Sequence, residues 1–412
     1  MKKKGLLNIL RYICLICVLS IGLMTIIGSG GGGDGWLDDV YFSIYHSVDI
    51  SDINNDGNQD IAGARTYFSQ SSPPEGSVAL LYQDGQNPGR FPSVKRIDTG
   101  GEPICITTGD LNDDGLEDIA TANSTTNNIS IIYQDPVVTG EFLPTNNISI
   151  GFSPSFLKIG DINDDGFNDI VISGSNTSIL YQDSNSPGSF LPMVNLNIGS
   201  SSVDIGDING NNYLDLALAG RGLDGTQIHL LFQDSLTPGN FLPPVSLTAG
   251  FQPHSIKIKD IDIDGKVDLI VGNYGKSDNP NTGGVSVFIQ DPSVAGTFLP
   301  RVDYPLGRRA ENLAIGDLNN DGFEDIAVAN GYTGGGEDSN GSIAILFQNV
   351  SSLGEFLSPV FYPGIFQPGS IAIGDLNEDS FNDIAFGDEA LAIRFQDSTN
   401  PGSFKQIIIV DD

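Results

Sequence analysis

The residues best suited to chemistry in this sequence are clusters of acidic and amide side chains that return along the chain. Residues 109–123 read GDLNDDGLEDIATAN, and the phrase contains the plan Asp-x-Asn-x-Asp-Gly-x-x-Asp. Oxygen-bearing side chains therefore occupy positions 1, 3, 5 and 9 of the loop. Alternate positions of a tight turn can point inward together, and the Gly at position 6 permits a positive φ. Oxygen ligands with several carboxylates favour calcium over softer metals, and the carbonyl at position 7 can add another oxygen.

The acidic loop occurs seven times, and successive first aspartates lie 46 to 58 residues apart. At positions 1, 3, 5 and 9 the fourth loop (207–215) has two carboxylates and should bind calcium most weakly, whereas the fifth (260–268) has four and should bind most strongly. Asn212 and Ser380 replace the Gly of the fourth and seventh loops, and Asn tolerates a positive φ better than most residues. The predicted ligands, for up to seven calcium ions, are Asp52, Asn54, Asp56, Asp60, Asp110, Asn112, Asp114, Asp118, Asp161, Asn163, Asp165, Asp169, Asp207, Asn209, Asn211, Asp215, Asp260, Asp262, Asp264, Asp268, Asp317, Asn319, Asp321, Asp325, Asp375, Asn377, Asp379 and Asp383.

The charge balance favours bound cations. The chain carries 52 acidic against 19 basic residues, a formal net charge of -33, and 21 of the acidic residues stand at the predicted ligand positions of the seven loops. Seven divalent ions would offset 14 of these charges; solvated turns rich in Asp and Asn are the alternative. The same charge argues against nucleic acid and an anionic membrane surface as partners, because both would repel the chain.

Two further landmarks accompany each acidic loop. A Gln stands after an aromatic residue or Ile, as in YQD at 82–84 and FQN at 347–349, and a Phe lies eight residues beyond that Gln in all seven copies. Alternating apolar and polar residues predict four short strands per repeat, which in the second copy are 104–109, 118–123, 129–135 and 142–150. The acidic loop then joins the first strand to the second.

Four antiparallel strands that repeat radially describe a propeller blade. The expected fold is all-β: a seven-bladed β-propeller of four-stranded antiparallel blades that occupies residues 37–412 as one domain. Residues 37–46 and 405–411 could each supply an outer strand to the last blade. A helix–loop–helix calcium site is excluded, because position 12 is Gly63 in the first copy and Thr121 in the second instead of Glu, and the flanks are strand-like.

The phrase IGDLNNDGFEDIAVAN (315–330) and its six relatives resemble the FG-GAP or VCBS-type repeats of integrin α-subunit propellers and of many exported bacterial proteins. The resemblance covers residues 37–412. It implies calcium in the hairpin between the first and second strands, on the lower rim of the propeller. It implies little about ligand or activity, because this scaffold hosts adhesins, receptors, lyases and domains of unknown role.

The N-terminal segment has the pattern of an export signal. A basic start precedes 17 uncharged, mostly apolar residues, so 1–28 is expected to be a signal peptide or, alternatively, a membrane anchor, and 29–36 a Gly-rich linker. Ser29 rather than Cys stands at the junction, which argues against lipidation. The protein is therefore expected to be periplasmic, secreted or on the cell surface. Cys105, the one Cys beyond the signal, is expected to be a small buried apolar residue.

Length variation between the repeats is concentrated in the loop between the second and third strands. The gap from the last Asp of the acidic loop to the following Gln varies from 13 to 23 residues. This loop should lie on the face opposite the calcium hairpins, and variable loops on a rigid scaffold often carry binding. The longest copies (64–76, 273–284 and 330–341) contain the predicted ligand-binding residues, with inert surface loops as the alternative: Arg65, Tyr67, Phe68, Tyr274, Lys276, Tyr332, Glu337 and Asp338.

The innermost strands offer another candidate site. The residue six positions before each first Asp should face a central funnel; these residues are His46, Ile104, Ser155, Ser201, His254, Glu311 and Gly369. His46, His254 and Glu311 could form a weak metal or acid–base site, although ordinary rim residues are the preferred interpretation. The third histidine, His229, is expected on a sheet face.

The function expected from these features is that of an exported, calcium-stabilised adhesion or interaction module for a protein or glycan. The sequence contains no nucleophile elbow, zinc-protease helix or phosphate loop, so an enzyme is less expected. The alternatives are a carbohydrate-active, lyase-like enzyme that uses the funnel, and a structural scaffold of an envelope assembly.

Overall fold

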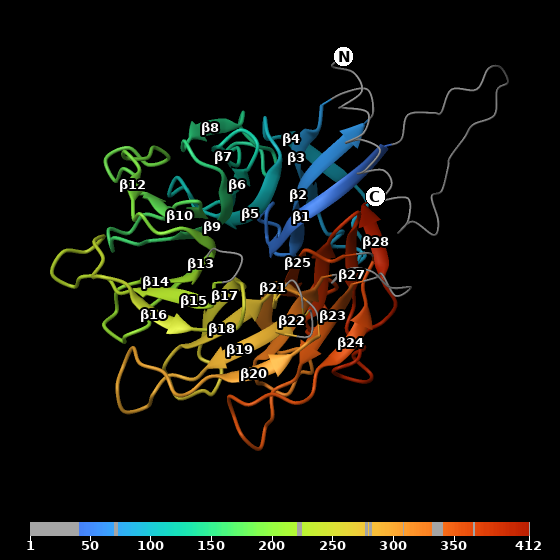
Figure 1. Cartoon of the computed structure of the whole chain (residues 1–412). Coiled ribbons are helices and arrows are strands. Elements are labelled where there is room, and N and C mark those ends of the chain that lie inside the picture. Colours follow the sequence, from blue (N-terminus) through green and yellow to red (C-terminus); the bar gives the residue numbers. More distant parts are fainter. Residues whose placement is uncertain are drawn as a thin grey trace, which may run out of the picture.

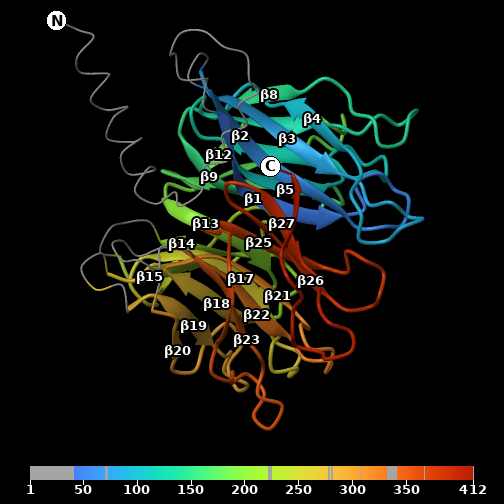
Figure 2. The same ribbon diagram turned by 90° about the vertical axis from the view of Figure 1, so that its right-hand side faces the viewer.

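Each repeat folds into one sheet of four antiparallel strands that neighbour one another in chain order. In this computed structural model seven such sheets surround a central axis, with the first strand of each sheet innermost (Figure 1). Figure 2 shows the same ring from the side. The expected all-β seven-bladed propeller is therefore confirmed. The structure describes residues 41–69, 73–220, 225–276, 279, 282–307, 309–331, 341–365 and 367–411.

Some predicted features lie outside these residues: the signal or anchor segment (1–28), the linker (29–36), and the loop residues Tyr332, Glu337 and Asp338. Within the described residues, no helix is long and apolar enough to cross a membrane.

The strands of the first four blades are two to seven residues long, except β1 and β2, which have 11 and 10 residues. Blade 1 contains β1 (Tyr41–Ser51), β2 (Asp60–Ser69), β3 (Glu75–Leu81) and β4 (Val94–Asp98). Blade 2 contains β5 (Pro103–Gly109), β6 (Asp118–Asn123), β7 (Asn128–Ile132) and β8 (Asn146–Ser149). Blade 3 contains β9 (Pro154–Gly160), β10 (Asp169–Gly174), β11 (Ser178–Leu180) and β12 (Val194–Asn195). Blade 4 contains β13 (Ser200–Gly206), β14 (Asp215–Gly220), β15 (Gln227–Leu231) and β16 (Val245–Thr248).

The remaining blades repeat the same order. Blade 5 contains β17 (Pro253–Lys259), β18 (Asp268–Asn273), β19 (Gly284–Phe288) and β20 (Val302–Pro305). Blade 6 contains β21 (Ala310–Gly316), β22 (Asp325–Asn330), β23 (Ser342–Leu346) and β24 (Val360–Pro363). Blade 7 contains β25 (Ser370–Gly374), β26 (Asp383–Gly387), β27 (Leu391–Arg394) and β28 (Ile408–Asp411).

The fourth strand is shorter than the sequence predicts. In blade 2 the predicted run 142–150 forms a strand only at β8, because Pro144 has no N–H to donate to a ladder. Before that proline, Phe142 pairs with Gln134 as an isolated bridge, and the Gln and Phe landmarks of blades 3 to 7 pair in the same way. The constant spacing of eight residues is thus the length of a closed turn.

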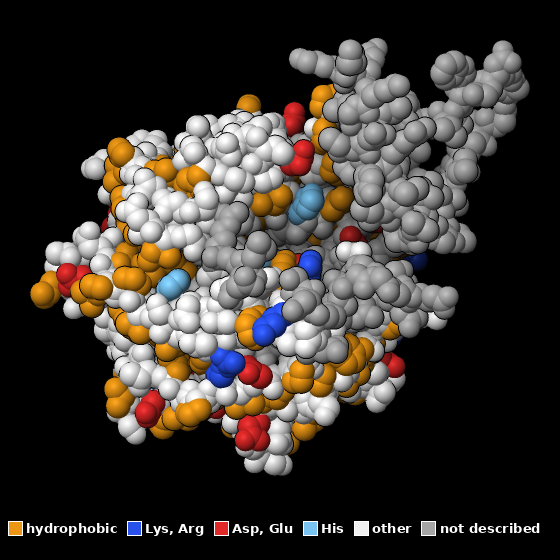
Figure 3. All heavy atoms as spheres, viewed as in Figure 1, with side chains coloured by type: hydrophobic (Ala, Val, Ile, Leu, Met, Phe, Trp, Pro, Cys, Tyr) orange, Lys and Arg blue, Asp and Glu red, His pale blue; other side chains and the backbone are white. Residues whose placement is uncertain are grey.

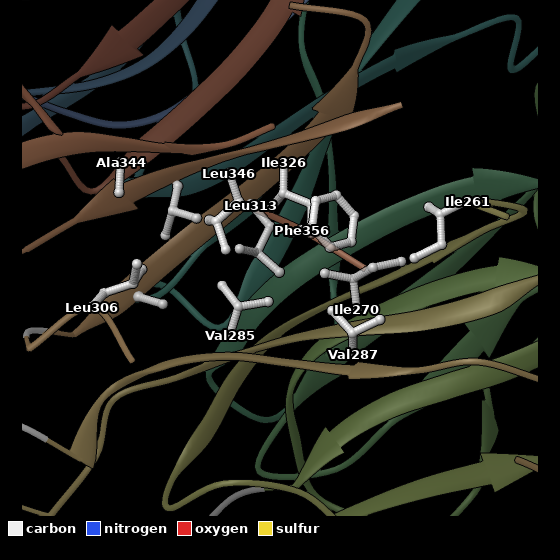
Figure 4. Packing of buried hydrophobic residues seen from close by; sticks show 12 residues of the cluster. Ile261, Ile270, Val285, Val287, Leu306, Leu313, Ile326, Ala344, Leu346 and Phe356 are labelled. Carbon is white, nitrogen blue, oxygen red and sulfur yellow. The ribbon is translucent and has the colours of Figure 1, made fainter. Parts of the chain in front are cut away.

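The core lies between the blades. Seven clusters of buried apolar side chains each join one blade to the next. Between blades 5 and 6, Val285, Val287 and Leu313 belong to one such cluster (Figure 4). Each fully buried Val, Leu or Ile contributes about 1.5–3 kcal/mol. Cys105 belongs to the cluster between blades 2 and 3 and is 1% exposed, as expected.

The ring closes without exchange of strands between its two ends. The sequence offered two segments for the outer strand of blade 7, 37–46 and 405–411. The C-terminal segment supplies it, as β28 at residues 408–411, whereas residues 41–46 belong to the innermost strand of blade 1. Tyr45 connects blade 1 to blade 7, because its N–H donates to the carbonyl oxygen of Asp388 at 2.6 Å. Its side chain packs in the cluster that contains Leu391 and Ile393 of blade 7. Side-chain packing and main-chain hydrogen bonding therefore close the ring.

Candidate metal centres and binding face

Each acidic loop is a tight hairpin held by its own side chains. In the second loop, Asp110 accepts hydrogen bonds from the backbone N–H groups of Asp114 (3.3 Å) and Gly115 (2.8 Å). Position 6 has a positive φ in every loop: 82° at Gly115, and 66° at both Asn212 and Ser380. The fourth turn therefore forms with Asn, as expected, and the seventh forms with Ser.

The carboxylate at position 9 is buried and connects the hairpin to the third strand. In blade 6, Asp325 Oδ1 accepts from the N–H of Gln348 at 2.8 Å, and Oδ2 accepts from the N–H of Leu318 at 2.9 Å. The Gln N–H donates to the position-9 carboxylate at 2.7–2.8 Å in all seven blades. Position 9 is therefore a structural acceptor as well as a predicted ligand.

The landmark Gln also holds the hairpin in place through its side chain. This role was not predicted from the sequence. Gln348 Nε2 donates to the carbonyl of Glu324 at 2.9 Å, and its Oε1 accepts from the N–H of Gly354 at 3.0 Å. In blade 2, Gln134 Nε2 also donates to the carbonyl of Ile53 in blade 1 at 2.8 Å. The available signal was the presence of this Gln at the same place in every repeat.

The fifth loop tests whether the donor set suits a cation. Carboxylate oxygens of Asp260, Asp262 and Asp268 all lie within 4.8 Å of one another. Asp260 Oδ1 is buried and has no hydrogen-bond partner within the described chain. Ile263, which stands between Asp262 and Asp264, has a φ of 62°, an unfavourable conformation for a β-branched residue. Clustered carboxylates with an orphaned buried oxygen suit calcium, and these Asp side chains would hold it.

Burial also perturbs the position-9 carboxyl groups. Loss of hydration is the main cause of a raised pKa at this position, and the negative charge of neighbouring carboxylates in the same loop raises the pKa further. The pKa rises from 3.8 to about 7 at Asp60, Asp118, Asp169, Asp268, Asp325 and Asp383, and to about 6 at Asp215. A bound cation would compete with this proton.

These raised pKa values predict the pH dependence of the calcium-free protein. Between the unfolded pKa of 3.8 and the folded pKa of about 7, the folded state binds more protons than the unfolded chain. The free energy of unfolding therefore falls as the pH rises through this window. We expect a higher melting temperature at about pH 5 than at about pH 8 in calcium-free buffer, measured by calorimetry. A melting temperature that rises from about pH 5 to about pH 8 without calcium would contradict this expectation.

The predicted funnel residues line a cavity of about 410 Å³ at the axis. In blades 1 to 6 each of them is the extra residue at a β-bulge of the innermost strand; in blade 1 the register shifts between Tyr45 and Ser47. A bulge redirects a side chain out of the regular alternation, which brings these residues to one cavity. The residues are His46, Ile104, Ser155, Ser201, His254, Glu311 and Gly369.

Two of the three acid–base candidates are linked by a tyrosine. Tyr274 O–H donates to Glu311 Oε2, and the hydroxyl oxygen of Tyr274 lies 2.8 Å from His254 Nε2. The rings of His254 and Tyr274 stack with centroids 4.0 Å apart. Burial, with a smaller effect of Arg309, lowers the pKa of His254 to about 4, and burial raises the pKa of Glu311. The site therefore holds a neutral imidazole at neutral pH.

His46 is not part of this group. It lines the same cavity, but its Nε2 lies 3.2 Å from Thr66 Oγ1. In the adjoining blade 7, burial raises the pKa of Asp388, which lines the same cavity, to about 7. Sequence spacing placed the three candidates on one funnel but could not show that Tyr274, assigned to an exposed loop, links two of them.

The other ligand-binding candidates are dispersed on the face opposite the hairpins. Arg65 and Tyr67 line a cavity of about 800 Å³. Phe68 stacks on Phe42 with centroids 4.8 Å apart, and Lys276 Nζ lies 4.2 Å from the centroid of Phe251. Figure 3 shows basic side chains near the middle of one face of the ring, histidine side chains both near the middle and toward the edge, and apolar side chains spread over the face. His229 lies in β15 and contacts Ser246, as expected for a sheet-face residue.

Comparisons with known proteins agree with this geometry. A family model described as "FG-GAP-like repeat" matches residues 52–121, 161–218, 207–271 and 260–328, which together exceed half of the chain. No curated protein matches the sequence significantly. The structure of BBS1N in complex with ARL6DN is similar at 12% identity, over 87% of this chain and 94% of that one, with a TM-score of 0.54. A protein from Lactobacillus plantarum is similar at 11% identity, over 91% and 97%, with a TM-score of 0.51. At such identities the likeness concerns the fold.

Proposed function

We propose that this chain, which belongs to the family of FG-GAP-like repeat proteins, is a calcium-stabilised interaction module. It binds a protein or a glycan on the face opposite the acidic hairpins. The observation that carries the proposal is the contrast between the two faces. The hairpin polar groups are used by the blades themselves, through position 9 and the landmark Gln. The opposite face holds the funnel and the cavity of Arg65, both lined by polar side chains.

Export to the periplasm, the cell surface or the medium belongs to the same proposal. Its support is the pattern of residues 1–28, and calcium sites of the extracellular kind suit such a location. A scaffold role in an envelope assembly would use the same face to hold a neighbouring protein.

Binding should depend on the proposed face and not on the hairpin face. The double variant Tyr67→Ala with Lys276→Ala removes two side chains from separate places on the proposed face. We expect it to weaken retention of the purified full chain on a glycan array, or on immobilised cell-surface proteins, by about tenfold or more. Arg90→Ala, an exposed change in the turn between β3 and β4 on the hairpin side, is the matched control. Equal loss in both variants, or no binding to either probe, would refute the proposal.

A second candidate function, acid–base chemistry in the funnel, is favoured by the contact of Tyr274 with His254 and Glu311. The tyrosine has a single hydroxyl proton, which it donates to Glu311, so His254 Nε2–H must donate to the tyrosine oxygen. The other ring nitrogen of His254, Nδ1, then carries no proton and can accept one. His254 is thus a base held in one tautomer by Tyr274 and, through it, by Glu311, which is the arrangement that proton abstraction requires.

Tyr274→Phe tests this second candidate. Uronate-containing polysaccharides are the probes, and unsaturated or newly reducing ends are the measured products. If the funnel is catalytic, the variant should lower kcat by about 100-fold with little change in KM, since it removes the group that orients the base. A wild-type chain without activity on these polysaccharides, or a variant with full activity, would remove the support for an enzyme.

A further inference from the structure

We propose that the cavity beside blade 1 is a binding site for a neutral saccharide unit. This inference rests on the proposed function and names the ligand class for part of the same face. The cavity has a volume of about 800 Å³, within the range of small-molecule sites. It is lined by β2, β3 and β4 of blade 1, by the connection at Gly100 to Glu102, and by the turn at Thr125 and Thr126.

Arg65 is the central donor of this cavity. Its side chain is 9% exposed, and Nη2 donates to Ser43 Oγ at 2.6 Å. The guanidinium carbon lies 5.1 Å from the centroid of the Tyr67 ring, which holds the group in place. Nε, however, is buried with no acceptor among the residues that the structure describes. A buried charged group with an unmatched donor is costly, and an oxygen of a bound molecule would relieve that cost.

Arg65, Ser77 and Asp98 form a row of polar side chains across three neighbouring strands. Ser77 is the cross-strand partner of Arg65, and Asp98 is the cross-strand partner of Ser77. Cross-strand partners share one face of a sheet, so the three side chains lie side by side. Ser77 Oγ is also buried and lacks a hydrogen-bond partner in the described part of the chain. The row therefore presents a cationic donor, a hydroxyl group and a carboxylate.

Other blades carry a shorter side chain at the place of Arg65, although Asn330 Oδ1 in blade 6 also lacks a partner within the described residues. The residue at the place of Arg65 is Asn123 in blade 2 and Asn330 in blade 6. Asn123 Nδ2 donates to Asn128 Oδ1 at 2.8 Å, and Asn330 Nδ2 donates to Ser342 Oγ at 3.2 Å. In those blades a short amide reaches its cross-strand partner. The longer side chain of Arg65 is directed to Ser43 instead, so Ser77 keeps its bonding capacity for another molecule.

The chemistry of the row points to a neutral sugar. Each sugar hydroxyl can donate and accept, so adjacent hydroxyls can bond Arg65, Ser77 and Asp98 together. An anionic ligand is disfavoured, because three carboxylates, those of Glu75, Asp98 and Glu102, line the cavity against the two guanidinium groups of Arg65 and Arg96. An ordered water molecule is the alternative occupant, since it too could bond both unmatched atoms.

Arg65→Asn is the informative variant, because blades 2 and 6 already fold with Asn at this place. Glucose, galactose, mannose, rhamnose and N-acetylglucosamine are the probes, at millimolar concentrations, with the full calcium-loaded chain. Saturation-transfer NMR measures binding, and crystals soaked in the same sugars locate it. We expect at least one sugar to bind the wild-type chain and to bind Arg65→Asn about tenfold or more weakly. Arg90→Asn removes the same charge on the hairpin side and should leave binding unchanged. Glucuronate and galacturonate should bind more weakly than the neutral sugars.

Three results would overturn the saccharide inference. They are binding of none of the five neutral sugars, binding that is equal in wild type and Arg65→Asn, and soaked crystals that contain ordered water only at Arg65. If such a result accompanies retained protein binding on the same face, the interaction module stands and the saccharide site alone is refuted. If binding of every probe survives the Tyr67 and Lys276 changes, the proposed function fails separately.

Discussion

Calcium should raise the melting temperature of this protein by more than 10 °C. Sites of the extracellular kind have dissociation constants of about 10⁻⁴ to 10⁻³ M. At ten times the dissociation constant, mass action stabilises the folded state by about 1.4 kcal/mol per site, and therefore by about 10 kcal/mol for seven sites. Unfolding entropy of about 2 cal/mol/K per residue converts this gain into more than about 10 °C for a ring of this length.

Calorimetry in chelator and in millimolar calcium provides the measurement, and magnesium at the same concentration is the control for ionic strength. The rise in melting temperature scales with the number of hairpins, because each ion binds the folded loop and not the unfolded chain. Superimposable melting curves in chelator and in calcium would show that the acidic loops are solvated turns.

Removal of a position-9 carboxylate should destabilise the protein even without calcium. Asp325→Ala deletes the acceptor of two buried N–H groups, those of Leu318 and Gln348. Each unmatched buried donor costs about 1–3 kcal/mol, so we expect a loss of about 3 kcal/mol in the free energy of unfolding. Urea denaturation in chelator measures this loss. Asp325→Asn keeps one carbonyl oxygen and should give an intermediate value.

Asp321→Ala is the matched control in the same hairpin. Asp321 is exposed and accepts from the N–H of Phe323 at 3.0 Å, so its loss should cost no more than about 1 kcal/mol without calcium. Both alanine variants should lose the stabilisation that calcium adds at this hairpin. Equal destabilisation by Asp321→Ala and Asp325→Ala in chelator would contradict a structural role for position 9.

The ring and the hairpins could be predicted because their information is local and periodic. The acidic loop keeps one plan in every repeat, and the Phe always follows the Gln by eight residues; Gln134 and Phe142 indeed pair across one closed turn. Bulges also follow the repeat, which is why counting six residues back from the first Asp found the funnel-facing positions. Periodicity was less informative about strand length, since a single proline shortened the predicted run at 142–150 to β8.

Contacts that belong to one blade could not be predicted in this way. Tyr274 was assigned to an exposed loop, yet it stacks on His254 and bonds Glu311 from the neighbouring blade. That contact depends on how a long connection returns over the funnel, which no repeat encodes. Arg65 was selected from its loop, but its unmatched Nε becomes visible only when the cross-strand partner and the ring of Tyr67 are placed around it.

The way the ring closes has a mechanical consequence. Blades 1 to 7 follow one another along the chain, whereas blades 7 and 1 meet without a shared strand, through the packing and the hydrogen bond of Tyr45. A pulling force between the two chain ends acts on β1, the innermost strand of blade 1, and on β28, the outer strand of blade 7. Because β28 pairs with β27 through three residue pairs, whereas a buried apolar cluster joins blades 7 and 1, we expect the force to detach β28 first. Under tension the outer C-terminal strand should therefore yield before the ring opens.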